Sequence, residues 1–189
     1  MIEEQDLIEK ILSGDTEAYA EIVRSYQVKV LGFCTSLLAN TTEAEDAAQE
    51  VFIKAYQSLK SFRGNSSFST WLYRITANHC KDLLRKRSRR KTESLDALME
   101  ASECEAQKHW EPSFNPASAR DASEQIERLL SSLSEEERLV LTLREAQGLS
   151  YQEIAETMKC TLDAVKSRLK RASQSLEEKT RHFLTGQNV

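Results

Sequence analysis

The chain has 189 residues, of which 30% are charged and 40% are hydrophobic, as in ordinary soluble globular proteins. It contains only 5 Gly and 2 Pro, too few for a turn-rich all-β sandwich or barrel, and no apolar run approaches the roughly 20 residues of a membrane-spanning helix. The acidic start of the chain excludes a secretion signal, which begins with a basic and then an apolar segment. We therefore expect a cytoplasmic, mostly helical protein.

The net charge of −4 conceals four blocks of alternating sign. The net charge is −7 over residues 1–59, +9 over residues 60–92, −9 over residues 93–137 and +3 over residues 138–189. Basic blocks attract phosphate backbones, whereas acidic blocks repel them. The blocks therefore predict different partners for different segments.

The first 60 residues predict two helices. Asp15 can cap the first, whose apolar residues follow steps of three and four: Tyr19, Ile22, Val23, Tyr26, Val30, Phe33 and Leu37. Thr42 and Glu45 form a capping box for the second, whose apolar positions are Ala47, Ala48, Val51, Phe52, Ala55 and Leu59. Opposite that stripe lies a mixed face of Asp46, Gln49, Glu50 and Ile53. This face suits a protein partner, although plain solvent exposure also explains it.

A polar loop over 61–69 leads into a helix that ends in the basic run 85–91. Aromatic residues lie among basic ones here: Phe62, Phe68, Trp71 and Tyr73 among Arg63, Arg74 and Lys81. Stacking on aromatic rings combined with backbone charge is how proteins hold single-stranded nucleic acid. Asn78 shares a helix face with Trp71 and could contact a base edge. The alternative is that Trp71 and Phe68 belong to the core.

Periodicity fades over residues 92–119, where acidic residues and both prolines collect. We interpret this segment as a flexible acidic linker between two small helical domains, residues 1–91 and 120–189. Trp110 and Phe114 within it either dock on a partner or fold back on the domains. The expected fold class is all-α.

The last 70 residues predict a helix-turn-helix. Ser134 with Glu137 and Ser150 with Glu153 are capping boxes, and Gly148 ends the helix between them. After a break at 159–161, a longer helix has Leu162, Val165, Leu169 and Leu176 on its apolar side. Its outer surface carries Lys166, Ser167, Lys170 and Arg171, with Arg168 at the edge. That surface suits the major groove of DNA, although a soluble helical hairpin with a basic face is the alternative.

No motif of catalysis is present, and we expect no enzyme activity, no cofactor and no metal site. The three histidines, His79, His109 and His182, lie far apart without obvious partners. The cysteines, Cys34, Cys80, Cys104 and Cys160, form no C-x-x-C pair and are expected to be reduced thiols.

Three segments, in this order, resemble the extracytoplasmic-function (ECF) sigma factors of bacterial RNA polymerase. They are DAAQEVF at 46–52, SFRGNSSFSTWLYRI at 61–75, and LREAQGLSYQEIA at 143–155 followed by VKSRL at 165–169. The resemblance implies a region 2 domain over residues 1–91 and a region 4 domain over residues 120–189. The middle stretch is closest to the sigma-E subgroup, associated with envelope stress.

The resemblance implies the partners and the residues that meet them. Core polymerase, through its β′ clamp and β subunits, would meet Asp46, Gln49, Glu50, Phe52 and Ile53. The melted strand of the −10 element would meet Phe62, Arg63, Asn65, Ser67, Phe68, Trp71, Arg74, Asn78 and Lys81. Duplex DNA of the −35 element would meet Lys166, Ser167, Arg168, Lys170 and Arg171. A membrane-anchored anti-sigma factor would hold the protein inactive at the inner membrane face.

Two other classes of protein remain open from the sequence. One is a DNA-binding regulator that works without polymerase, through the helix-turn-helix alone. The other is a thiol- or metal-responsive sensor built on the four cysteines.

Overall fold

The computed structural model describes residues 4–99, 129–130 and 132–184. The described residues form helices joined by short connections and contain no strand, which confirms the expected all-α fold. Within these ranges, no helix is both long enough and apolar enough to cross a bilayer. Trp110 and Phe114 of the predicted linker lie outside them.

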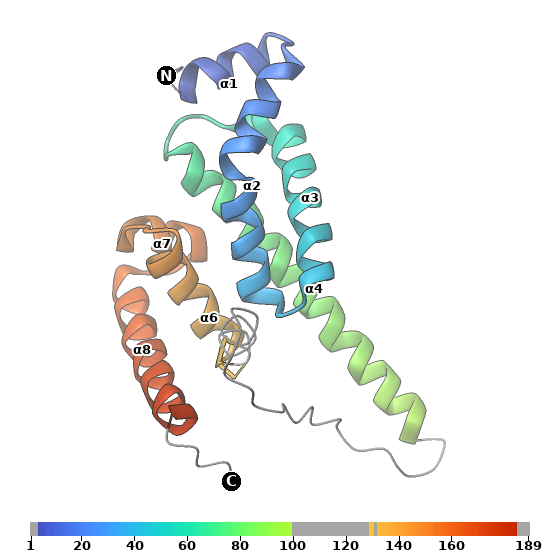
Figure 1. The fold of residues 1–189 in the computed structure, drawn as a ribbon, viewed down its shortest axis with the longest axis vertical. Helices are drawn as coiled ribbons and strands as arrows, with labels where there is room; N and C mark the ends of the chain where they lie inside the picture. The colour runs from blue at the N-terminus through green and yellow to red at the C-terminus, as the bar shows by residue number, and fades with distance from the viewer. Residues whose placement is uncertain (1–3, 100–128, 131, 185–189) are drawn as a thin grey trace.

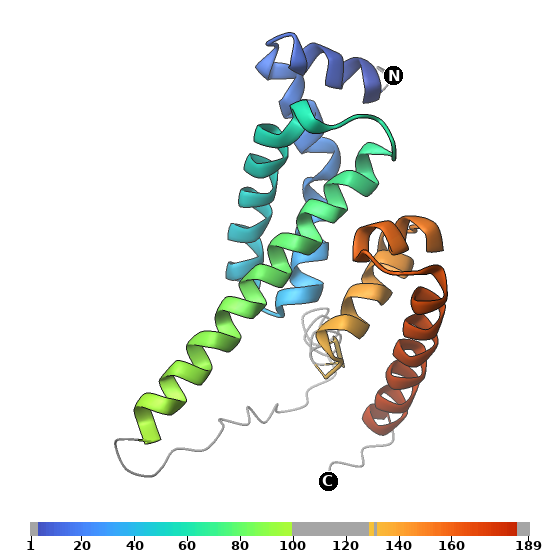
Figure 2. The ribbon, with the colours of Figure 1, turned by 180° about the vertical axis from the view of Figure 1, so that it is seen from behind.

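The N-terminal half is a helical bundle in which α2 and α3 run alongside each other and α4 crosses both obliquely (Figures 1 and 2). The sequence did not predict α1, which buries Ile8 and Ile11. Helix α4 continues beyond the expected domain boundary at residue 91. The elements are α1 (Glu4–Leu12), α2 (Thr16–Leu38), α3 (Thr41–Ser58), the 3-10 turn η1 (Leu59–Ser61) and α4 (Phe68–Met99).

Side chains at the helix ends explain where α2 and α3 begin. The carboxylate of Asp15 accepts hydrogen bonds from the backbone N–H groups of Glu17 and Ala18 at 3.0 and 3.3 Å, as predicted. The predicted Thr42 cap is wrong, because α3 begins earlier. Asn40 is the N-cap, in an extended conformation, and its side-chain oxygen accepts from the N–H of Glu43 at 3.0 Å.

The core of the bundle consists of the apolar stripes predicted for α2 and α3, joined by residues of α4. Phe33, Val51 and Leu72 each expose 0% of their surface. The hydroxyl of Tyr19 donates to the backbone carbonyl of Phe52 at 2.6 Å, which joins α2 to α3. These contacts fix the relative rotation of the helices and so decide which faces stay exposed.

The C-terminal half contains the helix-turn-helix. Both predicted capping boxes are present, at Ser134 before α6 and at Ser150 before α7. Lys159, in the left-handed conformation, ends α7, and Gly148 also has a positive φ of 68°. Leu162 begins α8 but is 45% exposed, so its predicted place in the core is wrong. The elements are α6 (Glu135–Leu141), the π turn η2 (Thr142–Ala146), α7 (Tyr151–Met158) and α8 (Leu162–Leu184).

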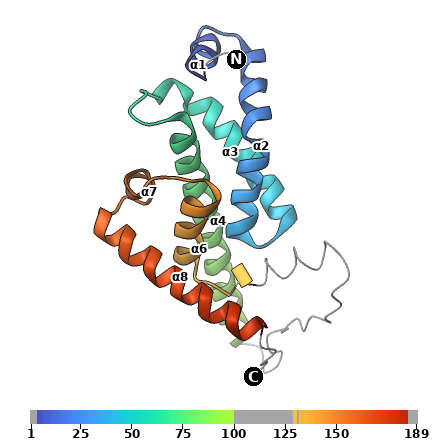
Figure 3. The ribbon, with the colours of Figure 1, turned by 60° about the vertical axis from the view of Figure 1, so that its left-hand side comes forward.

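The two halves pack against each other, with α6 and α7 next to the N-terminal bundle and α8 on the outer side (Figures 1 and 3). The guanidinium of Arg138, which is 8% exposed, donates to the backbone carbonyl of Leu37 at 2.9 Å. The hydroxyl of Thr70 donates to Oε1 of Glu153 at 2.6 Å. Polar groups from both halves are thus paired across the contact.

Candidate functional site

The polar face predicted on α3 is exposed. Asp46, Gln49 and Glu50 all face solvent, and Ile53 is 56% exposed, an unusual position for an isoleucine. Phe52 differs from this group because only 9% of it is exposed. Its ring belongs to the core, so a partner that docks on α3 would meet the other four residues directly.

The aromatic residues of the 62–71 segment form one cluster with Tyr26 of α2. The ring centroids of Phe62 and Trp71, and those of Phe68 and Trp71, are 5.4 Å apart, and those of Tyr26 and Phe68 are 5.6 Å apart. Only 2% of Phe68 and 6% of Trp71 is exposed, and Phe62 is half-buried. This burial favours the core alternative for Phe68 and Trp71, which hold the preceding loop in place.

The polar residues predicted to contact a DNA strand are arranged around this cluster. Arg63, Asn65 and Ser67 are exposed in the loop between η1 and α4, and Ser67 Oγ accepts from the N–H of Thr70 at 3.1 Å. Arg74 is half-buried farther along α4. The aromatic cluster thus supports a loop whose polar side chains face solvent.

Asn78 is exposed and lines a shallow cavity of about 420 Å³ between α3 and α4 that is wide open to solvent. Most of its lining residues are of polar type, but apolar atoms, including those of Ile75, contribute more of the lining surface than polar atoms do. The other lining residues are Lys54, Gln57, Ser58, His79 and Asp82. An amide beside hydroxyl and ammonium groups can form hydrogen bonds with the edge of a nucleobase. Except for Asn78, the sequence analysis assigned none of these residues to a site, because two helices contribute them.

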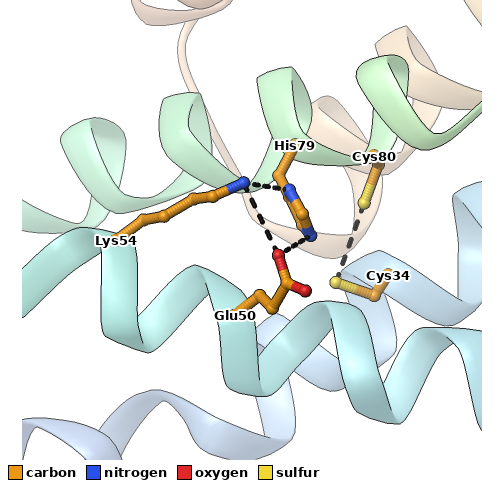
Figure 4. A network of polar contacts seen from close by, with 5 residues as sticks. All are labelled: Cys34, Glu50, Lys54, His79 and Cys80. Atoms are coloured by element: carbon orange, nitrogen blue, oxygen red, sulfur yellow. Dashed lines mark hydrogen bonds and ion pairs between the residues drawn. The ribbon is translucent and has the colours of Figure 1, made fainter. Parts of the chain in front are cut away.

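A network of charges adjoins this cavity and joins α4 to α3 (Figure 4). The ammonium of Lys54 donates to Nδ1 of His79 at 2.5 Å, and Nε2 of His79 lies 3.5 Å from Oε2 of Glu50. Burial, followed by the charge of Lys54, lowers the pKa of His79, which is 6% exposed. His79 therefore has partners that its isolated position in the sequence did not indicate.

The helix-turn-helix presents the predicted basic surface. Lys166, Ser167, Lys170 and Arg171 are exposed along one side of α8, while Val165 and Leu169 are buried behind them. Arg168 is only partly exposed and pairs with Glu136 of α6 at 2.8 Å. Its predicted place at the edge of the surface is thus the observed one.

Lys81 lies apart from the other residues predicted to contact a DNA strand. With Arg168 it lines a cavity of about 340 Å³ between the two halves, together with residues of α6 and α7. Burial lowers the pKa of Lys81, and the charges of Arg85 and Arg168 lower it further. In this arrangement Lys81 faces the C-terminal half.

Two of the cysteines meet in the core of the N-terminal bundle. The thiol of Cys80 donates to the sulfur of Cys34 at 3.7 Å, and both residues expose 0% of their surface (Figure 4). The hydrogen bond to Cys34 and burial both raise the pKa of the Cys80 thiol. A thiol held neutral and buried is a poor nucleophile, which disfavours a thiol sensor built on this pair.

Both halves of the chain match known protein families. The Sigma-70 region 2 family matches residues 22–90, and the Sigma-70 region 4 family matches residues 123–176. The chain is 39% identical over 179 residues to the RNA polymerase sigma-H factor of Pseudomonas aeruginosa, covering 93% of each chain. It is 37% identical over 184 residues to the ECF RNA polymerase sigma-E factor of Escherichia coli K12, covering 96% of each chain.

Two of the solved structures that resemble the fold are complexes. One is the sigma factor RpoE in complex with the anti-sigma factor NepR from Bartonella quintana, with a TM-score of 0.64 and 25% identity over 85% of this chain and 97% of that one. The other is CnrH in complex with the cytosolic domain of CnrY, with a TM-score of 0.69 and 24% identity over 96% of this chain and 97% of that one.

Proposed function

Because the chain belongs to the ECF sigma factors of bacterial RNA polymerase, we propose that its exposed surfaces divide the work of such a factor. The chain is a transcription initiation factor rather than an enzyme. In this proposal its N-terminal half, residues 1–91, binds core polymerase and the −10 element, and residues 120–189 bind the −35 element. Residues 92–119 join them. The family matches at 22–90 and 123–176 support this division.

The polymerase surface in this proposal is the exposed face of α3. A partner there meets two carboxylates, an amide and an exposed isoleucine, so the face offers both polar and apolar contacts, as protein interfaces do. Phe52 contributes indirectly, by packing α3 on the bundle. The residues that the β′ clamp would contact are Asp46, Gln49, Glu50 and Ile53.

The −10 strand in this proposal follows the loop between η1 and α4 and places an unstacked base in the Asn78 cavity. The observation that carries this assignment is the exposed amide of Asn78 in a cavity of about 420 Å³ beside the polymerase-binding helix. Arg63, Asn65 and Ser67 contact the strand from the loop. Phe68 and Trp71 support that loop from the core, and within the 62–71 segment the half-buried Phe62 is the aromatic ring that a base could reach.

The −35 duplex in this proposal lies along the exposed side of α8. Four side chains there offer donors to phosphates and base edges, and one of them, Lys166, pairs with Asp163 at 3.3 Å. Arg168 would have to leave Glu136 to reach DNA.

Regulation by an anti-sigma factor extends the proposal. The solved structure of RpoE that resembles this chain contains an anti-sigma factor, and we propose that a membrane-anchored factor holds this chain at the inner membrane face until stress releases it. Fractionation of unstressed and stressed cells tests this point. If the same share of the protein is found in the cytosolic fraction of unstressed and of stressed cells, anchoring at the membrane is contradicted.

Gel filtration with bacterial core polymerase tests the main proposal without knowledge of the promoter. We expect the native protein to co-elute with core polymerase and Asp46→Arg to elute separately, because the substitution reverses a charge on the docking face. Glu21→Arg, an equal charge reversal on the exposed side of α2, is the matched control and should co-elute. If the native protein also elutes separately, a DNA-binding regulator that works alone becomes the better hypothesis.

A further inference from the structure

His79 lies between the two surfaces that the proposed function assigns to the N-terminal half. Its imidazole extends from α4 toward α3, where Glu50 belongs to the polymerase-binding face and Lys54 lines the Asn78 cavity (Figure 4). His79 itself is only 6% exposed, whereas the side chains of Glu50 and Lys54 are 61% and 47% exposed. A buried ring thus accepts a hydrogen bond from one side chain that reaches solvent and lies 3.5 Å from another.

The contact with Lys54 decides which nitrogen of His79 carries the proton. An ammonium group has only donors, so Nδ1, at 2.5 Å from Nζ of Lys54, must be the acceptor. The ring is then neutral with its proton on Nε2, which faces Oε2 of Glu50 at 3.5 Å. Glu50 also attracts Lys54, at 3.8 Å. The neutral ring of His79 therefore lies between the positive ammonium of Lys54 and the negative carboxylate of Glu50.

We propose, on the basis of the proposed function, that His79 is a positioning residue whose neutral imidazole holds the Lys54 ammonium at the Asn78 cavity, where it contacts the promoter strand. Lysine is a flexible point charge on a four-carbon stem, and free it would sample many rotamers. A buried acceptor removes that freedom before the strand arrives. The entropy of ordering Lys54 is then lost on folding and not on binding.

Protonation of His79 would undo this arrangement. Nδ1 would become a donor, and two positive groups would face each other at the present 2.5 Å contact. The charged groups that face the ring are Glu50 and Lys54 from α3 and Asp82 and Lys86 from α4. Burial and Lys54 lower the pKa of His79, which keeps the ring neutral at neutral pH. Acid should therefore displace Lys54 and weaken strand capture.

Three substitutions separate positioning from a merely structural role. His79→Asn keeps an acceptor at the place of Nδ1 but does not titrate, His79→Leu removes the acceptor, and Lys54→Met removes the ammonium. The probe is a single-stranded oligonucleotide that the native holoenzyme enriches from a randomised pool. Its affinity for each holoenzyme is measured as a function of salt and between about pH 7.5 and pH 5.5.

We expect Lys54→Met and His79→Leu each to lower strand affinity by roughly three- to ten-fold at about pH 7.5, and the double variant to lose no more than either. Lys54→Met should also reduce the salt slope by about 0.7, the value for one contact with single-stranded DNA. His79→Asn should keep most of the affinity and lose its pH dependence. Core polymerase affinity should change less than about two-fold in all three.

Several results would overturn the proposal: unchanged strand affinity in His79→Leu, equal losses of polymerase and strand affinity, or a pH dependence that persists in His79→Asn. If a His79 variant fails to fold, Lys54→Met remains informative because its side chain is half exposed. The ring pKa of His79 in the free protein, measured by NMR against His109 and His182, needs no polymerase. Lys54→Met should raise the pKa of His79, and an unchanged pKa would refute this inference. If the native protein forms no complex with core polymerase, that result would refute the proposed function alone.

Discussion

At the scale of single residues, burial and hydrogen bonds decide which protonation state His79 and Glu153 adopt. His79 is a neutral ring because its surroundings exclude water and place Lys54 beside it. Glu153 shows the opposite case: it is a carboxylate that accepts from the hydroxyl of Thr70 and from Ser150, and these bonds lower its pKa, with Thr70 the largest cause. Both groups couple folding to pH, but in different ranges.

We predict that the free energy of unfolding falls as the pH decreases below about 6.5, the value of an unperturbed histidine. The unfolded chain binds a proton at His79 in this range, whereas the folded chain, with its lowered pKa, does not. Stability is therefore retained above about pH 6.5 and lost toward the folded pKa. Urea denaturation of the native protein and of His79→Asn measures the difference.

In His79→Asn, the free energy of unfolding should vary less with pH in that range. A second loss of stability should remain at lower pH. Glu137 and Glu153 have lowered pKa values, so their contribution is lost only as the pH falls below the ordinary value of about 4.5. Identical curves for the two proteins between about pH 5 and pH 7 would show that His79 does not titrate as its surroundings indicate.

At the scale of elements, helix caps and a few buried side chains set the orientation of α7 and α8. Helix α7 has only 8 residues and would be marginal alone, so the capping box of Ser150 and Glu153 and the burial of Ile154 stabilise it. Helix α8 packs on α6 and α7, and its Val165 and Leu169 are buried. That packing turns the basic side of α8 outward, where a duplex can reach it.

We predict that Arg171→Ala and Arg168→Ala each weaken binding of the holoenzyme to its −35 duplex by about 1–3 kcal/mol, the cost of losing a contact to a base edge. Arg168→Ala should lose less, because the native residue must first leave Glu136. Arg181→Ala, later in α8, is the matched control. Competition binding with matched and scrambled −35 duplexes is the measurement, and equal losses on both would indicate phosphate contacts only.

At the scale of the whole molecule, the contact between the halves conflicts with the proposed binding of both promoter elements at the same time. Elements named −10 and −35 lie about 25 base pairs apart, or roughly 85 Å along B-DNA. In this structure Thr70, at the start of α4, is 2.6 Å from Glu153 of the helix-turn-helix. Under the proposed function, the protein must separate its halves before both surfaces reach DNA, which breaks the Thr70 and Arg138 bonds.

We predict that Thr70→Val together with Arg138→Met opens the molecule, because each substitution removes a donor of a bond between the halves. The expected change is a larger radius of gyration in small-angle X-ray scattering. Ser175→Ala is the control, since Ser175 donates to Glu137 within the C-terminal half at 2.7 Å. An unchanged radius in the double variant would mean that apolar contacts hold the halves together.

Local patterns in the sequence predicted the helices well where a cap or a periodic stripe was present. Asp15, Ser134 and Ser150 are the caps that were predicted, because a capping side chain bonds only to groups two or three residues away. Asn40 was missed in favour of Thr42, since neighbouring polar residues compete for the same role. Helix α1 was missed because no capping motif preceded its short stripe.

The sequence by itself determined the all-α fold, the helix-turn-helix, the exposed face of α3 and the family, because these depend on spacing along one chain segment. Only the tertiary structure decided that Phe68 and Trp71 are buried, that Lys54 joins Asn78 at one cavity, and that His79 has charged partners. Those facts depend on how α3 and α4 rotate against each other. Packing of the whole core sets that rotation, and periodicity within one helix carries no information about it.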